Sequence, residues 1–306
     1  MPPSSPTHFQ LRPRESIRDG ILRIVETLAD QPASPAPRDR SDRPATIHAT
    51  RLALKRARAL VRLLRPTLGS RLATRLNRSL RTASQRLAQA RDTTVGLQQL
   101  DRLRRKRPAA DAHALSQVRA QFAKASQEQE LSAAQVTQNL ARARTALRST
   151  ARSLKTAPWK HKGWAIVSAG IEAGYRRARK RLRTARTSTE DAAFHAWRTA
   201  SKSLFYQLTL VRPISKGRLH RWIQDLDQLQ DDLGQLNDLS NLALQVATPQ
   251  SASATKPAVE RSLSILQREQ DRLRKQTLRQ GRRLLAERPP EFLERLTHDW
   301  KAWRKK

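Results

Sequence analysis

The chain contains no cysteine, few glycines and few aromatic residues, and each scarcity excludes a class of site. Of 306 residues none is Cys, 9 are Gly and 4% are aromatic. Without cysteine there can be no disulfide, zinc–thiolate site or thiol nucleophile. We find no phosphate-cradling glycine loop and no convincing carboxylate cluster for magnesium. The sequence therefore predicts no metal site, no cofactor and no catalytic residue.

Long apolar runs are also missing. No stretch of about 18 apolar residues occurs, and the N-terminal MPPSSPTHFQLRPRE lacks the apolar core of a secretory signal. Hydrophobic residues still make up 38% of the chain, which is enough for a lean core. We therefore expect a soluble, cytoplasmic protein that does not insert into membranes.

Negative charge is scarce. Lys and Arg total 61 against 26 Asp and Glu, so the net charge is +35, far beyond what solubility requires. A partner should supply the missing negative charge, and nucleic acid, an anionic membrane surface and inorganic phosphate polymers all qualify. The excess of arginine suits bidentate phosphate recognition, although a coding bias toward Arg and Ala explains it as well.

The chain reads as helical almost throughout, because Ala, Leu, Arg and Gln dominate and strand signals are nearly absent. Residues 1–12 are expected to be a disordered tail, and residues 13–306 one domain with approximate halves 13–156 and 157–306. Prolines and turn residues predict helices over 14–29, 45–65, 70–90, 92–106, 111–156 (as one helix or two), 163–186, 189–211, 216–247, 258–286 and 290–304.

One segment carries a regular pattern of positive charge. Residues 46–66 read TIHATRLALKRARALVRLLRP. On a helix, the 3-4-3-4 spacing of its basic residues places them in one stripe about 20 Å long, opposite an apolar face. This first stripe, which we interpret as a surface for a polyanion, consists of His48, Arg51, Lys55, Arg58 and Arg62. A further basic face is predicted at Arg71, Arg75 and Arg78.

The pattern recurs later in the chain. A second stripe consists of His195, Arg198 and Lys202, with the spacing of the first. Downstream of each stripe a Leu-x-Gln-x-x-Asp sequence ends at Asp92 and Asp238, at nearly the same distance from the histidine. This recurrence favours an internal duplication of a helical unit, with a chance match in a very basic chain as the alternative.

Taken together, these segments resemble the CHAD family, the conserved histidine alpha-helical domain. The resemblance spans most of the chain and rests on IHATRLALKRAR (47–58), LAQARDTTV (87–95), YRRARKRLRTAR (175–186), FHAWRTASKSLFY (194–206) and LGQLNDLSNL (233–242). It implies an all-α fold of two four-helix bundles related by pseudo-twofold symmetry, with extra terminal helices. It also implies a basic groove between the bundles that binds inorganic polyphosphate without catalysis, and association with polyphosphate granules.

The resemblance also implies which residues contact the ligand. Besides both stripes, it points to the basic helix between them, at Arg176, Arg179 and Arg183. The second copy has Phe205-Tyr206 where the family tends to have Arg-Tyr, so the second half should contribute less.

Some roles stay open at the level of sequence. His48 and His195 head matched stripes, which favours phosphate contact over a structural role. Asp92 and Asp238 are each expected early in a helix, where a structural or orienting role is favoured over that of a catalytic acid. The main alternative function is nonspecific nucleic-acid binding, for which we find no aromatic RNA motif, zinc finger or helix-turn-helix, and the third is a phosphohydrolase.

Overall fold

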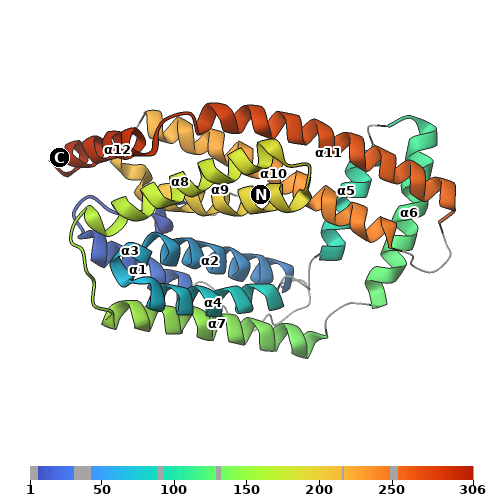
Figure 1. The fold of residues 1–306 in the computed structure, drawn as a ribbon. Coiled ribbons are helices and arrows are strands. Elements are labelled where there is room, and N and C mark those ends of the chain that lie inside the picture. Colours follow the sequence, from blue (N-terminus) through green and yellow to red (C-terminus); the bar gives the residue numbers. More distant parts are fainter. Residues whose placement is uncertain are drawn as a thin grey trace.

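The computed structural model describes residues 6–30, 43–87, 92–105, 107–128, 132–215, 217–248 and 254–305. Within these ranges the protein is all-helical and contains no strand (Figure 1). The helices are α1 (Ile17–Asp30), α2 (Arg43–Leu63), α3 (Arg65–Leu68), α4 (Ser70–Arg86), α5 (Asp92–Arg104), α6 (Ala109–Glu128), α7 (Ala133–Thr156), α8 (Ala165–Thr187), α9 (Asp191–Val211), α10 (Arg218–Ala247), α11 (Lys256–Leu284) and α12 (Pro289–Arg304).

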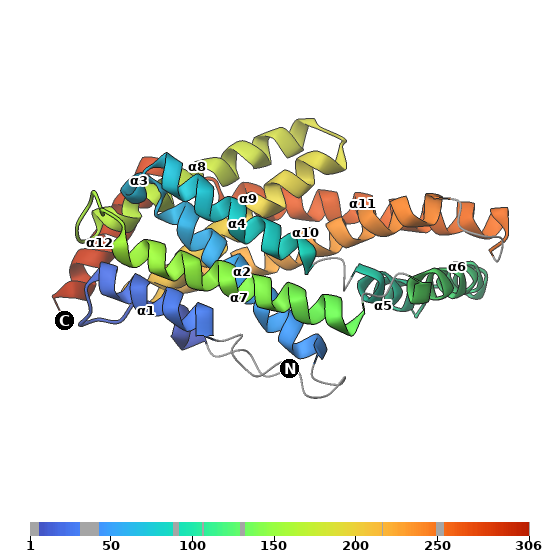
Figure 2. The same cartoon turned by 90° about the horizontal axis from the view of Figure 1, so that it is seen from below.

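The longer helices form two groups of four. Helices α1, α2, α4 and α7 pack on one another, and α8, α9, α10 and α11 form the second group (Figures 1 and 2). The two groups join mainly where α2 packs against α9. The prediction of two four-helix bundles therefore agrees with the packing, while the pseudo-twofold relation and the internal duplication stay predictions.

The hairpin of α5 and α6 departs from the expected division into halves. Both helices precede residue 156, yet they pack on α10 and α11 of the second group. Arg261 Nε donates to Asp111 Oδ1 at 2.7 Å, and Arg102 Nη1 donates to Gln235 Oε1 at 2.8 Å. The hairpin therefore belongs to the first half of the chain by sequence, but it packs on helices of the second group.

The predicted segment 111–156 is two helices. Helix α6 ends at Glu128, and α7 begins after Ser132. The Ser132 side chain accepts from the backbone N–H of Gln135, whose own side chain accepts from the N–H of Ser132. This capping box satisfies amide groups that a helix start leaves unpaired, so it fixes the first turn of α7.

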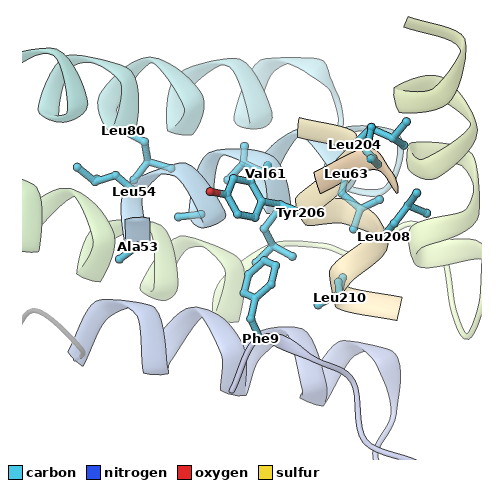
Figure 3. Close-up of a cluster of buried hydrophobic side chains, with 14 of the residues drawn as sticks. Phe9, Ala53, Leu54, Val61, Leu63, Leu80, Leu204, Tyr206, Leu208 and Leu210 are labelled. Atoms are coloured by element: carbon cyan, nitrogen blue, oxygen red, sulfur yellow. The ribbon is translucent and has the colours of Figure 1, made fainter. Parts of the chain in front are cut away.

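Buried apolar side chains of both groups form one core cluster, and part of it lies where the first group contacts α9. Leu54 and Val61 of α2 are fully buried and meet Leu204 and Tyr206 of α9 in one apolar cluster (Figure 3). Because these α2 residues recur at helical spacing, burying them turns the first stripe away from the core.

The N-terminal segment differs from its predicted disorder. Residues 1–5 lie outside the described residues, but Pro6–Phe9 forms a short 3₁₀ helix. Phe9 is buried and contacts Tyr206 edge-to-face, with ring centroids 6.4 Å apart (Figure 3). The backbone N–H of Leu11 donates to Leu210 O at 3.0 Å. The buried side chains of Phe9 and Leu11, together with this hydrogen bond, hold in place residues that the sequence pattern alone assigned to a disordered tail.

Candidate functional site

The first stripe lies on the side of α2 that faces α4 and, at its C-terminal end, α8. His48 is exposed, and Arg51, Lys55, Arg58 and Arg62 are half-buried. All five lie within α2, which confirms that the segment is one helix.

Helix α4 runs beside this stripe and contacts it through neutral oxygens. Arg51 Nη1 donates to Leu87 O, just after α4, at 3.0 Å. Arg58 Nε donates to Asn77 Oδ1 at 3.4 Å. The neutral amide oxygen of Asn77 orients the Arg58 guanidinium without cancelling its charge.

Four arginines come together near the C-terminal end of the stripe. The pKa of Arg62 is lowered to about 10, mainly because its guanidinium is buried. Positive charges nearby lower this pKa further, and they belong to Arg58, Arg177 and Arg81. Burial, followed by the charge of Arg81, also lowers the pKa of Arg58. We call Arg58, Arg62, Arg81 and Arg177 the cation cluster.

The cation cluster draws on both helix groups. Arg58 and Arg62 lie on α2, Arg81 lies on α4, and Arg177 lies on α8 of the second group. None of the four forms an ion pair with a described carboxylate. Crowded like charges without counter-charges make a site that an anion would stabilise.

A cavity of about 540 Å³ opens along α8 next to the cluster, and it shares Arg177 with it. Its lining carries Arg176, Lys180 and Arg181, and Glu172 supplies its one carboxylate. Glu172 forms an ion pair with Arg176, so the cavity keeps an excess of positive charge.

The three residues expected on α8 point to different surroundings. Arg176 lines the cavity, whereas Arg179 Nη2 donates to Ala286 O at 3.3 Å, toward the end of α11. Arg183 is exposed. The residue that joins the stripe is Arg177, which sequence reasoning missed.

A glycine explains why Arg177 reaches the cluster. Gly170 lies seven residues before it, on the same face of α8. A Cβ at Gly170 would overlap the carbonyl oxygen of Leu63, so α8 crosses close to the end of α2 at this point. In the sequence, Gly170 was therefore the signal of a close helix crossing. Only the packing of α8 on α2 shows which face of α8 this glycine marks.

The second stripe faces α10 instead. His195 Nδ1 lies 2.6 Å from Asn237 Oδ1. Burial and the charge of Arg198 lower the pKa of Lys202, whereas three carboxylates on α10 act in the opposite direction. They belong to Asp231, Asp227 and Asp238. The contacts above join the first stripe to α4 and α8 and the second stripe to α10, so the two stripes have different surroundings.

The aspartates of the two repeats occupy different positions in their helices. Asp92 opens α5 as expected, but its side chain lies outside the described residues. The expectation that Asp238 lies early in a helix is wrong, because α10 begins at Arg218. The helix dipole therefore does not explain Asp238, whose carboxylate instead accepts from Asn237 Nδ2 at 3.5 Å. Among the described residues, no group of three or more His, Asp or Glu is placed to hold a metal.

Comparison with known proteins assigns the family. The sequence profile of the CHAD domain matches residues 23–245, most of the chain. The chain belongs to the CHAD family. In this CHAD protein the match includes the whole first stripe, α8 and the second stripe.

A solved structure supports the fold. The crystal structure of the CHAD domain from the plant Ricinus communis is similar, with a TM-score of 0.66, 21% identity, and coverage of 90% of this chain and 94% of that chain. No curated protein matches the chain significantly. No helix in the described ranges is long and apolar enough to cross a membrane.

Proposed function

We propose that this CHAD protein binds inorganic polyphosphate, without catalysis, at the cation cluster and along the first stripe. The observation that carries the proposal is the cluster itself, in which arginines of both helix groups gather without a carboxylate partner. Because Arg177 comes from the second group, the proposed site lies where the two groups meet, and this position supports the expectation of a groove between the bundles.

Polyphosphate matches the chemistry of these side chains. Each phosphate offers oxygen acceptors and negative charge, so recognition needs repeated donors and no group that reads bases. Residues three and four apart on a helix lie about 5 to 6 Å apart, so neighbouring cations can share adjacent phosphates. Within the proposal His48, Arg51 and Lys55 extend the site along α2, and Arg176 extends it into the cavity on α8.

The first test is a charge-removal variant with a matched control. We expect Arg58→Gln/Arg62→Gln/Arg81→Gln to weaken polyphosphate binding and to reduce the slope of log affinity against log salt by about one per lost contact. The control removes the same charge from the outer face of α4, with Arg71→Gln/Arg75→Gln/Arg78→Gln. Titration of both variants with labelled polyphosphate measures the effect, and equal losses would reject the cluster as the site.

Competition decides between polyphosphate and the main alternative. At physiological salt we expect long-chain polyphosphate to displace duplex DNA from the protein, because the described part of the site offers no aromatic side chain for stacking on bases. Preferential retention of DNA would support a nonspecific nucleic-acid-binding protein instead. Release of orthophosphate from pure polyphosphate with magnesium, lost in Asp92→Asn or Asp238→Asn, would support a phosphohydrolase.

Location follows from the same proposal. A noncatalytic polyphosphate binder would reside in the cytoplasm and collect on polyphosphate granules. Microscopy of a fluorescent fusion should show foci that disappear when polyphosphate synthesis is removed.

A further inference from the structure

Helix α11 carries a third row of cations on the face that points to solvent. Arginine or lysine recurs along it with a 4-3-4-3 spacing, which is the spacing of the first stripe in reverse order. On a helix such a row spans about 20 Å. We call it the third stripe, and it consists of five exposed residues, Arg268, Arg272, Lys275, Arg279 and Arg282.

The packing of α11 fixes this orientation. Its apolar side chains, among them Leu266 and Leu273, are buried where α11 packs on α6, α8 and α10. At Gly281 a Cβ would overlap the ring of Trp197 on α9, so the helix approaches the core closely there. These three positions lie on the side of α11 opposite the third stripe, so the helix cannot rotate to bury the cations.

The positive charge of the third stripe is mostly uncompensated. Four of its five members form no ion pair with a described carboxylate. The fifth, Arg272, places Nη2 2.7 Å from Glu269 Oε1. At the edge of the stripe, Asp271 is paired with Arg274. A row of four positive charges therefore faces solvent, and a polyanion would neutralise it.

The third stripe is separate from the cation cluster. The cluster lies on α2, α4 and α8, whereas the stripe lies on the solvent side of α11, and α8 and α9 lie between α11 and α2 (Figure 1). Helix α11 also lies outside residues 23–245, which match the family profile. The surface is therefore not among the sequence features that carry the family match.

We propose that the third stripe binds a second segment of polyphosphate, so that one protein molecule holds two chains and crosslinks long polymer. The inference rests on the proposed function and concerns how many polymer segments the same protein holds. A phosphate polymer needs repeated cations at short intervals, and side chains three and four residues apart supply them here as on the first stripe. The stripe includes no aromatic side chain on which a nucleobase could stack, which favours a polymer of phosphate alone.

The test removes the four unpaired charges of the third stripe. The variant is Arg268→Gln/Lys275→Gln/Arg279→Gln/Arg282→Gln. The matched control removes three arginines and one lysine from exposed positions scattered over α7, α10 and α12, and it is Arg142→Gln/Arg152→Gln/Arg221→Gln/Lys301→Gln. Circular dichroism and thermal unfolding check that both variants keep the fold.

Light scattering measures crosslinking. With long-chain polyphosphate the third-stripe variant should lose most of the scattering that the wild type shows, because a binder with one surface cannot join two chains. The control has the same net charge as the variant and should keep the scattering. A result in which variant and control scatter equally would overturn the inference.

Short chains count the surfaces. Calorimetric titration with short-chain polyphosphate should give two bound chains per molecule for the wild type and the control, and one for the third-stripe variant. The affinity of the remaining site should change by less than about twofold, because substitutions far from the cation cluster act independently of it. One bound chain per wild-type molecule would also overturn the inference.

Two further results have separate meanings. If the third-stripe variant lost duplex DNA but kept both polyphosphate sites, the stripe would belong to nucleic acid and the inference would be wrong. Failure of the proposed function is a different result, because the wild type would then not bind polyphosphate, or its binding would not respond to Arg58→Gln/Arg62→Gln/Arg81→Gln.

Discussion

At the scale of single residues, Arg62 combines two roles that oppose each other. A guanidinium that is buried beside other cations destabilises the folded protein, as the lowering of its pKa to about 10 indicates. The same arrangement suits a site that waits for an anion, because binding removes the repulsion. Function and stability therefore make contrary demands on this position.

The first prediction is that Arg62→Met stabilises the unliganded protein at pH 8. Methionine keeps the apolar stem and removes the charge, so Tm should rise on the order of 2 °C, the shift that about 1 kcal/mol produces in a large domain. The exposed Arg71→Met serves as control, and its Tm should hardly change. A lower Tm for Arg62→Met would show that the charge is compensated in the folded state.

The pH dependence of this difference follows from linkage. The folded pKa of Arg62 is about 10, well below the ordinary pKa of an arginine, so between these two values the unfolded chain binds the proton more often. The destabilisation is therefore fully present below pH 10 and is relieved as the pH rises through 10. Urea unfolding of the wild type and Arg62→Met at pH 8 and pH 11 should show a smaller gap at pH 11, and a constant gap would contradict the argument.

At the scale of elements, the crossing of α8 over the end of α2 positions the cation cluster. The crossing depends on Gly170, because any side chain there would collide with the Leu63 carbonyl. A shift of α8 would also move Arg177 away from Arg62. Packing and binding are therefore coupled at one glycine.

We predict that Gly170→Ala destabilises the protein by about 1 to 3 kcal/mol, the usual cost of overpacking, and weakens polyphosphate binding. The control is Gly217→Ala, since nothing lies within 4 Å of a Cβ at that position. Chemical unfolding and polyphosphate titration of both variants measure the two effects. An unchanged affinity in a destabilised Gly170→Ala variant would remove Arg177 from the site.

Most elements were predictable because helix signals are local. The periodicity around Leu54 and Val61 and the proline breaks placed α2 and its neighbours within a few residues. Two features were not fixed by sequence pattern: the packing of the N-terminal segment, which was expected to be a disordered tail, and the choice between one helix and two over residues 111–156. The burial of Phe9 depends on a pocket supplied by α9, and the break between α6 and α7 rests on a capping box in a polar stretch without proline.

At the scale of the whole molecule, the net charge is +35, although α10 carries five aspartates and only two arginines. A strongly charged surface repels itself, so a bound polyanion should stabilise the folded state. The charge also makes this stabilisation depend on salt, because binding releases counterions.

We predict that long-chain polyphosphate raises the Tm of the protein at low salt. The folded state should be stabilised by about 2.7 kcal/mol when the concentration of free ligand is 100 times its Kd. The effect should shrink steeply as salt increases. Differential scanning fluorimetry with polyphosphate, and with orthophosphate as control, measures it. A rise of Tm with orthophosphate equal to that with polyphosphate would argue against a site for a polymer.

The amino-acid order by itself determined the helical class, the family and the first stripe, because helix periodicity, proline breaks and stripe spacing depend on neighbours within a few turns. The fold decided which cations meet. Arg81 and Arg177 join Arg58 and Arg62 only because α4 and α8 pack beside α2, and the charges of Asp227 and Asp231 act on Lys202 only because α10 packs on α9. Charge interactions act through space between helices far apart in the chain, so no local pattern contains them.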